Sequence, residues 1–465
     1  MSKALWGLPL IVLLVGTHVF LTIRLRFPQR YIFTAIRLSL SKEKGSNGDV
    51  SAYGALFTAL AATIGTGNIL GVSTAIALGG PGAVFWCWIT GVFGIATKYS
   101  EALLAVKFRV KTENGEMIGG PMYALERGLQ MKWLAVLFCI FTAIAAFGIG
   151  NMVQANAAAE LLATNYEVPN GVTGAVMCVC TAMVIFYGVK GIAKACTMLV
   201  PVMALFYVIS CLVILCINHD YVGGALSLII ETAFRPEAAG AGFVGGTLSA
   251  TIRYGISRGL FSNESGMGSA PIVAAAAKTR NPVRQALVSS TGTFWDTVVI
   301  CALTGMVVVS SMLAHPEVDV KQSTALISTA FNSIPHVGSA ILTIGLITFA
   351  FSTILGWSYY SEKAIEYLGG KKVIFYYHIV WIIGIFAGAV MELKAVWNIA
   401  DSMNALMAIP NLIALLLLSN VLVKETRRYL WKDRLYAWDK HELQMAQIER
   451  EKRMRKARKS KKQSV

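Results

Sequence analysis

Long apolar stretches alternate with short basic stretches along most of the chain. A helix needs about 20 mostly apolar residues to cross a bilayer, and the uncharged run Ala4–Ile23 is the first that is long enough. Lysine and arginine gather in every second interval between such runs, as they do in cytoplasmic loops. The pattern predicts an all-α polytopic membrane protein with eleven transmembrane helices, its amino terminus outside and its carboxyl terminus in the cytoplasm. The predicted spans are residues 4–23, 53–78, 81–106, 133–162, 172–189, 195–217, 241–268, 285–313, 337–368, 373–391 and 394–423.

The second apolar stretch, Tyr53–Leu78, is uncharged but contains glycine, threonine, glycine and asparagine in succession at residues 65–68. Glycine costs about 1 kcal/mol relative to alanine inside a helix. A helix that breaks inside a bilayer has to line a cavity or be buried in protein, because lipid does not satisfy free backbone groups. We therefore interpret the break as a binding site, where freed N–H and C=O groups replace the hydration of a polar solute. The alternative interpretation is a close helix–helix contact, which small residues also favour.

A second glycine-rich interruption, Gly259–Gly268, lies in the predicted helix that begins near Ala241. Each interrupted helix opens a block of five spans, and the basic loops give the two blocks opposite orientations. Interrupted helices at corresponding positions of inverted blocks predict an inverted repeat with the site at its interface. The predicted divisions are residues 1–50 for an N-terminal transmembrane helix and a cytoplasmic amphipathic loop, 51–217 for the first block, 218–239 for an extracellular loop, 240–423 for the second block and 424–465 for a basic cytoplasmic tail.

Composition supports a membrane protein and restricts its partners. Hydrophobic residues make up 55% of the chain and charged residues 14%, as is typical of a polytopic membrane protein. The net charge is +16, and 15 of the 41 lysine and arginine residues lie in Lys424–Lys462. Basic residues beside a membrane indicate contact with anionic lipid, whereas the basic and aromatic pattern of a nucleic-acid reader is missing from the sequence. The sequence gives no oligomeric state.

Three long motifs occur in the same order as in a known family. The first is GGPGAVFWCW at Gly79–Trp88, the second is RGLFSNESGMGSA at Arg258–Ala270, and the third is STILGW at Ser352–Trp357. With these motifs the chain resembles the alanine/glycine:cation symporter family, the sodium:alanine symporters, over all but its basic tail. It departs from the family at Cys87, where methionine is usual, and at Ser265, where alanine is more common.

The resemblance implies the leucine-transporter fold, an inverted repeat of two five-helix blocks, here preceded by one extra helix. It also implies a secondary active transporter, not an enzyme, that imports alanine, glycine or both with Na⁺ by alternating access and without an organic cofactor. Coupling to H⁺ is the alternative; it needs a titrating carboxylate at the site, and Tyr53–Leu78 has none. A channel is less favoured, because a repeated filter loop or rings of like charge are missing from the sequence.

A zwitterionic amino acid needs donors for its carboxylate and a shaped wall for its side chain. Backbone N–H groups at the first break approach a carboxylate closely, since glycine adds no side chain, and the start of a half-helix favours negative charge. Aromatic rings in the second and third motifs would exclude bulky substrates, although lone aromatic residues usually pack in a core. The predicted substrate-binding residues are Gly65, Thr66, Gly67, Asn68, Phe261 and Trp357.

Sodium needs several oxygen ligands, and freed carbonyls of a broken helix supply them. In sodium-coupled carriers of the fold that the resemblance implies, a Ser/Thr pair on the eighth core helix closes a sodium site against the first core helix. Ser352 and Thr353 lie on that eighth helix here. The alternative is that both hydroxyls bond to carbonyls of their own helix. The predicted sodium ligands are Ala61, Ile64, Ser352 and Thr353.

Further polar residues at membrane depth are expected to serve the site. Charges inside a membrane are costly and usually paired, so we expect Arg258 to pair with Asp296 or with Glu264, either as an inner gate or as a static pair. One residue of the polar group in residues 133–162 is expected to face the site, and the sequence does not distinguish among its members. This group consists of Asn151, Gln154 and Asn156.

Overall fold

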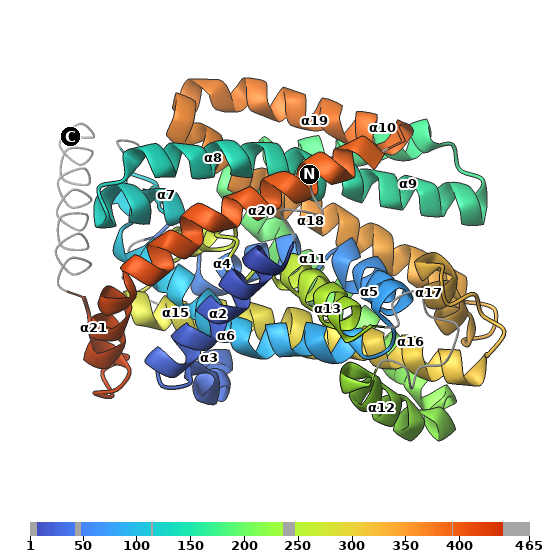
Figure 1. Cartoon of the computed structure of the whole chain (residues 1–465). Helices are drawn as coiled ribbons and strands as arrows, with labels where there is room; N and C mark the ends of the chain where they lie inside the picture. The colour runs from blue at the N-terminus through green and yellow to red at the C-terminus, as the bar shows by residue number, and fades with distance from the viewer. Residues whose placement is uncertain (1–6, 42–47, 113–114, 236–246, 393, 440–465) are drawn as a thin grey trace.

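The computed structural model describes residues 7–41, 48–112, 115–235, 247–392 and 394–439, which fold as packed helices with one short hairpin (Figure 1). In the hairpin, β1 (Val110–Lys111) pairs with β2 (Met117–Ile118) in antiparallel fashion. The helices of the first half are α2 (Leu8–Arg24), η1 (Pro28–Tyr31), α3 (Ile32–Ser39), α4 (Ala52–Thr63), η2 (Gly67–Gly71), α5 (Val72–Gly79), α6 (Ala83–Lys107), α7 (Pro121–Tyr123), η3 (Ala124–Gly128), α8 (Lys132–Phe147), η4 (Gly148–Met152), α9 (Val153–Tyr166), α10 (Asn170–Ile185), α11 (Gly188–Ile217) and α12 (His219–Phe234). Those of the second half are α13 (Leu248–Asn263), α14 (Pro271–Ala274), α15 (Pro282–Thr293), η6 (Phe294–Cys301), α16 (Ala302–Ala314), α17 (Ser323–Asn332), α18 (Gly338–Gly369), η7 (Lys371–Val373), α19 (Ile374–Val390), α20 (Lys394–Leu417) and α21 (Ser419–Tyr429).

The predicted apolar runs correspond to helices. Among the described residues, six helices are long and apolar enough to cross a membrane, and up to eight if each of two bent pairs is one span. One bent pair is α2 with η1 and α3, and the other is α4 with η2 and α5. Helix α10 is apolar but shorter. The protein is therefore a multi-pass membrane protein, and the number eleven stays a prediction.

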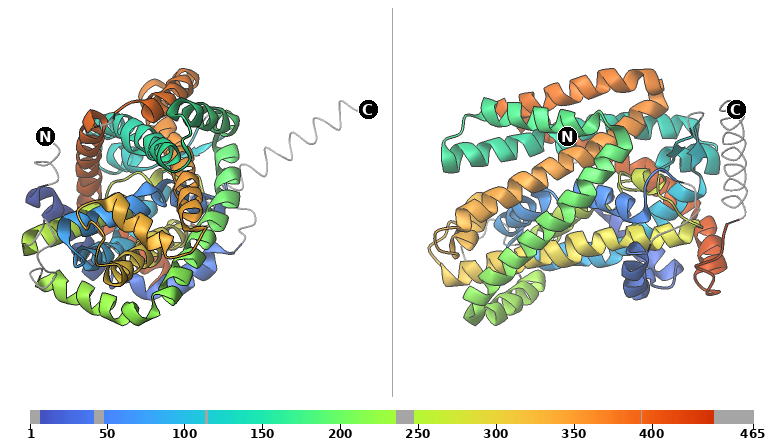
Figure 2. Two further views of the ribbon diagram at one scale, coloured as in Figure 1. Left: turned by 90° about the vertical axis from the view of Figure 1, so that its right-hand side faces the viewer. Right: turned by 180° about the vertical axis from the view of Figure 1, so that it is seen from behind.

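The packing encloses the two interrupted helices. Helix α18 packs against α4, α8 and α11, while α6 packs against α13 and α15. Figures 1 and 2 show α10 and α19 together on one side of the molecule and α12 on the opposite side, with α4 and α5 between these faces. Both breaks are thus surrounded by protein, as broken helices in a bilayer have to be.

The first predicted break is present. Helix α4 ends at Thr63, Ile64 has an extended backbone (φ −76°, ψ 91°), and the helix resumes as the π-helical turn η2. The axes before and after the break differ by 52°. The side-chain oxygen of Asn68 accepts the Gly65 N–H at 2.9 Å, so it replaces a helical carbonyl. The helix is therefore broken here, and its small residues also allow close contacts, since a Cβ atom at Gly65 would collide with Thr353.

The second break follows α13 and has a different geometry. Glu264, Gly266 and Gly268 are left-handed, with φ of 54°, 89° and 87°, a conformation that costs little only for glycine. The short α14 follows. The chain then passes the residues just before α4, where Val50 and Ala277 form a parallel β-bridge. The residues before α4 and the residues after α14 are therefore joined by backbone hydrogen bonds.

The segment 218–239, predicted as an extracellular loop, contains α12 within its described part. One face of α12 is buried at Ala225, Ile229 and Ala233, and the helix packs against α16. The predicted first span appears as α2, and the amphipathic segment after it as η1 and α3. Residues 1–6, 42–47, 236–246 and 440–465, which include most of the predicted basic tail, lie outside the described residues.

Candidate functional site

The first break faces α18, where the predicted Ser/Thr pair lies. The Ser352 hydroxyl is 2.9 Å from the carbonyl oxygen of Phe349 in its own helix and 3.4 Å from that of Ile64. The hydroxyl oxygen of Thr353 is buried and has no hydrogen-bond partner among the described residues. It lies so close to Gly65 that a Cβ atom there would collide with it. Bonding within the helix thus applies to Ser352, whereas Thr353 keeps an oxygen directed at the break.

Backbone carbonyls at the end of α4 lose their usual donors. In a continuous helix the N–H groups of Gly65 and Thr66 would donate to carbonyls four residues earlier, those of Ala61 and Ala62. Here Gly65 donates to Asn68 at 2.9 Å, and Thr66 donates to Gln154 at 3.4 Å. Carbonyl oxygens and hydroxyls of this kind suit a cation such as sodium.

Asn68, predicted to bind the substrate, uses its side chain within the protein. Its oxygen caps Gly65, and its amide nitrogen donates to Asp296 Oδ1 at 2.8 Å and to Cys301 Sγ at 3.3 Å. Asp296 also accepts from the Ser262 hydroxyl at 2.9 Å. The carboxylate therefore connects the first break to the end of α13. Sequence reasoning did not assign this role, although Asp296 is the sole carboxylate in the predicted span 285–313.

Phe261, a predicted pocket wall, lies over η2. A Cβ atom at Gly67 would be 3.2 Å from the Phe261 ring, so this glycine permits the close approach. The partly buried ring packs against a small cluster on other helices, which consists of Ala145, Ile149 and Ala400. The structure thus brings together Gly67 and Phe261 from the two interrupted helices; that they bind the substrate stays a prediction.

Trp357 lies one turn beyond Thr353 on α18 and is fully buried. Its side chain fills the space beside Gly150 of η4, where a Cβ atom would collide with it, and its ring meets Tyr360 edge to face at 5.6 Å. Its indole lies beside Glu264 at the second break. Trp357 therefore packs between η4 and the second break.

The three polar side chains of the fourth predicted span contact different parts of the molecule. Asn151 donates to the Trp381 carbonyl at 2.8 Å, and Asn156 donates to carbonyls at the end of α19. Gln154 instead accepts from Thr66 and donates to the Ile149 carbonyl at 2.9 Å. Gln154 is therefore the member of this group that contacts the first break.

The expected pairing of Arg258 is wrong for this structure. Asp296 accepts from Asn68 and Ser262, and Glu264 accepts from Ser269 at 2.5 Å. The charged neighbour of Arg258 is Asp401 of α20. Among the described residues, neither predicted pair forms, because the carboxylates of Asp296 and Glu264 accept hydrogen bonds from hydroxyl and amide donors at the breaks.

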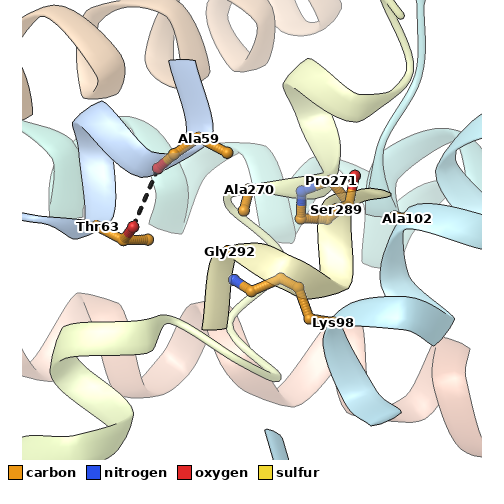
Figure 3. A pocket seen from close by; sticks show the side chains of 8 residues that line it. All are labelled: Ala59, Thr63, Lys98, Ala102, Ala270, Pro271, Ser289 and Gly292. Carbon is orange, nitrogen blue, oxygen red and sulfur yellow. Dashed lines mark hydrogen bonds between the residues drawn. The ribbon is translucent and has the colours of Figure 1, made fainter. Parts of the chain in front are cut away.

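A small cavity lies beside the first break (Figure 3). It has room for about one water molecule, too little for an amino acid. Figure 3 shows the Lys98 ammonium at this cavity, and Thr63 on its far side with its hydroxyl bonded to the Ala59 carbonyl. The lining residues are Ala59, Thr63, Lys98, Ala102, Ala270, Pro271, Ser289 and Gly292.

Comparison with known proteins gives consistent results. The sequence model of the sodium:alanine symporter family matches residues 1–442. The sodium/alanine symporter AgcS of Methanococcus maripaludis is 52% identical over 436 residues, 92% of this chain and 95% of that protein. An uncharacterized transporter of Haemophilus influenzae is 47% identical over 444 residues, 94% of this chain and 97% of that protein. The crystal structure of MhsT in complex with L-phenylalanine matches 80% of this chain and 89% of that chain, with a TM-score of 0.55 and 16% identity; the fold is that of the leucine transporters.

Proposed function

The chain belongs to the sodium:alanine symporter family, and from this membership we propose that it imports alanine, glycine or both together with Na⁺ by alternating access. It is a multi-pass membrane transporter and not an enzyme. The observation that carries the proposal is the buried Thr353 oxygen, which has no hydrogen-bond partner among the described residues and faces the backbone at Gly65. A cation held there would contact both α18 and the first broken helix.

The proposed sodium ligands are the carbonyl oxygens of Ala61 and Ile64 and the hydroxyls of Ser352 and Thr353. Support comes from the diverted N–H groups of the break, which free carbonyls, and from the 3.4 Å approach of Ser352 to Ile64. Oxygen ligands without a full negative charge suit a monovalent ion that must also be released. Sodium would therefore tie α18 to the end of α4.

The proposed substrate site lies on the same broken helix, at the residues that follow the carbonyls of the proposed sodium site. Its members are residues 65–68, with Phe261 and Trp357 as walls. The N–H groups of Gly65 and Thr66, which donate to Asn68 and Gln154 in this structure, would exchange these partners for the substrate carboxylate. The close contact between Gly67 and the Phe261 ring leaves little width, which favours a substrate with a methyl group or a hydrogen as its side chain. The Asn68 side chain shapes the break through Gly65 and Asp296, and its backbone N–H donates to the Gly65 carbonyl at 3.1 Å, so we propose that Asn68 serves the substrate by holding the shape of the break.

A proton-coupled symporter of the same substrates is a second candidate. Asp296 favours it, because this carboxylate is fully buried and hydrogen-bonded to the first break through Asn68. A protonation change at Asp296 would act directly on the geometry of the break. The sodium proposal is preferred because the chain belongs to the sodium:alanine symporter family and because the buried Thr353 oxygen, which has no hydrogen-bond partner among the described residues, faces Gly65.

Uptake of radiolabelled alanine into proteoliposomes under separately imposed Na⁺ and pH gradients tests both candidates. We expect an inward Na⁺ gradient to drive accumulation, glycine to compete and leucine not to compete. Accumulation driven by a pH gradient in the absence of Na⁺ would instead support the proton-coupled candidate. Strong competition by leucine would contradict the narrow pocket.

A further inference from the structure

The second break is organised around a buried carboxylate on α6. One oxygen of Glu101 accepts the N–H groups of Gly266 and Gly268, both at 3.0 Å, and the side-chain amide of Asn411 at 2.7 Å. Asn411 of α20 also donates to the Gly266 carbonyl at 2.9 Å. The same loop is therefore held from two helices, α6 and α20, that are far apart in the sequence.

The backbone at this break needs such a partner. Gly266 and Gly268 are left-handed, so their N–H groups point away from the path of a helix. A backbone polar group without a partner costs several kcal/mol inside a membrane. Glu101 supplies the acceptor that the interrupted helix lacks, and it is itself 3% exposed. The carboxylate thus takes the place of helical carbonyls for two residues of the break.

A buried positive charge lies one helical turn before Glu101. The ammonium of Lys98 is 3% exposed and without a hydrogen-bond partner among the described residues, and the second oxygen of Glu101 is likewise unpartnered. The two charges attract each other, and opposite charges offset part of the cost of burial. Lys98 therefore places a positive charge near the carboxyl group that holds the second break.

The segment that Glu101 holds continues directly from the proposed pocket wall. Phe261 and Ser262 lie in the last turn of α13, Glu264 begins the break, and Trp357 lies beside Glu264. We propose that Glu101 is a positioning residue for transport: its carboxylate fixes the path of residues 264–268 and thereby the place of Phe261 over the first break. This inference rests on the proposed symport function. It predicts that removing the carboxylate changes the pocket although Glu101 lies outside the proposed substrate and sodium sites.

The first test compares sodium-driven alanine uptake by Glu101→Ala, Glu101→Gln and Asn411→Ala. Glutamine keeps one acceptor oxygen, so we expect it to retain more activity than alanine. For Glu101→Ala we expect a loss of about tenfold or more in maximal rate per folded molecule, together with a raised KM for alanine. Glu160→Gln, an exposed glutamate on α9, is the matched control and should transport like the parent protein.

A second measurement does not depend on transport. Ala270 is buried beside the break, so Ala270→Cys should react slowly with a thiol reagent in the parent protein and several-fold faster with Glu101→Ala added. Unchanged labelling together with parental uptake in Glu101→Ala would overturn the inference. The two proposals can also fail separately. If Glu101→Ala speeds the labelling of Ala270→Cys but the parent protein shows no sodium-driven alanine uptake, the positioning role is supported and the proposed function is contradicted. A Glu101→Gln protein as impaired as Glu101→Ala in both measurements would contradict the acceptor role.

Discussion

At the scale of single residues, Thr353 is the most sensitive member of the proposed sodium site, because its buried hydroxyl oxygen has no hydrogen-bond partner among the described residues. Thr353→Ala should raise the Na⁺ concentration for half-maximal uptake by about tenfold or more, since a methyl group does not replace an oxygen ligand. Ser352→Ala should have a smaller effect, because Ser352 also bonds within its own helix. The double variant should be the weakest in Na⁺ activation.

Uptake measured against Na⁺ concentration at several alanine concentrations checks this prediction. Thr353→Ser keeps the oxygen and should stay near the parent protein. Thr181→Ala is a matched control, since Thr181 on α10 also has a buried hydroxyl without a partner among the described residues. An unchanged Na⁺ dependence in Thr353→Ala would mean that the sodium site lies elsewhere.

Gly67 and Gly71 lie one turn apart on η2 and offer a paired test of the substrate site. A Cβ atom at Gly67 would be 3.2 Å from the Phe261 ring, whereas a Cβ atom at Gly71 would meet nothing within 4 Å. Gly67→Ala should therefore raise KM for alanine, and Gly67→Leu should abolish uptake while the protein still inserts. Gly71→Ala should leave uptake nearly unchanged, because alanine is also the better helix former. Normal alanine binding by Gly67→Leu, measured by scintillation proximity, would refute the site.

At the scale of elements, ion pairs of Glu116 connect the β1–β2 hairpin to α18 and η7. Glu116 accepts from Lys371 Nζ at 2.7 Å and lies 3.7 Å from Lys363 Nζ. Burial raises the pKa of Glu116, but the hydrogen bond from Lys371 and the charges of Lys363 and Lys371 outweigh it and hold this pKa below its usual value of 4.5. The hairpin contact is therefore stabilising only while Glu116 is ionised.

A carboxyl group with a lowered pKa in the folded state contributes stability above its unfolded value, and this stability is lost as the pH falls through the folded pKa. Glu116→Gln should thus lower the melting temperature at neutral pH by about 1–2 °C, a small effect because the side chain is partly exposed. The difference should shrink as the pH falls below 4.5 and disappear once the pH lies below the folded pKa of Glu116. Thermal unfolding in detergent across this pH range checks it, with the exposed Glu317→Gln as control; a difference that grows toward low pH would contradict it.

Elements with a strong local signal were predictable from the sequence, and contacts between distant segments were not. The break at Gly65 follows from two glycines in an uncharged run, and the second break from the glycines after Arg258. Helix α12 was missed because its charges indicated a loop, although its buried Ala225 and Ile229 are four residues apart, the spacing of a helix face. The roles of Gln154 and Asp296 depend on helices that meet only in the folded protein.

At the scale of the whole molecule, the basic loops predict the orientation in the membrane. Tyr436, beyond α21, is 64% exposed, and the Glu317 side chain, between α16 and α17, is 74% exposed. In a protein with the exposed Cys216 replaced by serine, Tyr436→Cys should react with an impermeant thiol reagent only from the cytoplasmic side, and Glu317→Cys only from the outside. The reverse pattern in right-side-out and inside-out vesicles would refute the topology.

The proposed ion and substrate sites share one stretch of backbone, and this makes their coupling a property of the whole molecule. Sodium would bind carbonyl oxygens of residues 61–64 and join them to α18. Alanine would bind the backbone of residues 65–68. The factor by which Na⁺ raises alanine affinity must equal the factor by which alanine raises Na⁺ affinity. We expect this factor to be about 10–100 and to be strongly reduced in Thr353→Ala. Equilibrium binding of labelled alanine in Na⁺ and in choline, together with Na⁺ titrations at fixed alanine, measures both sides; equal alanine affinity in the two salts would show that the break does not couple the sites.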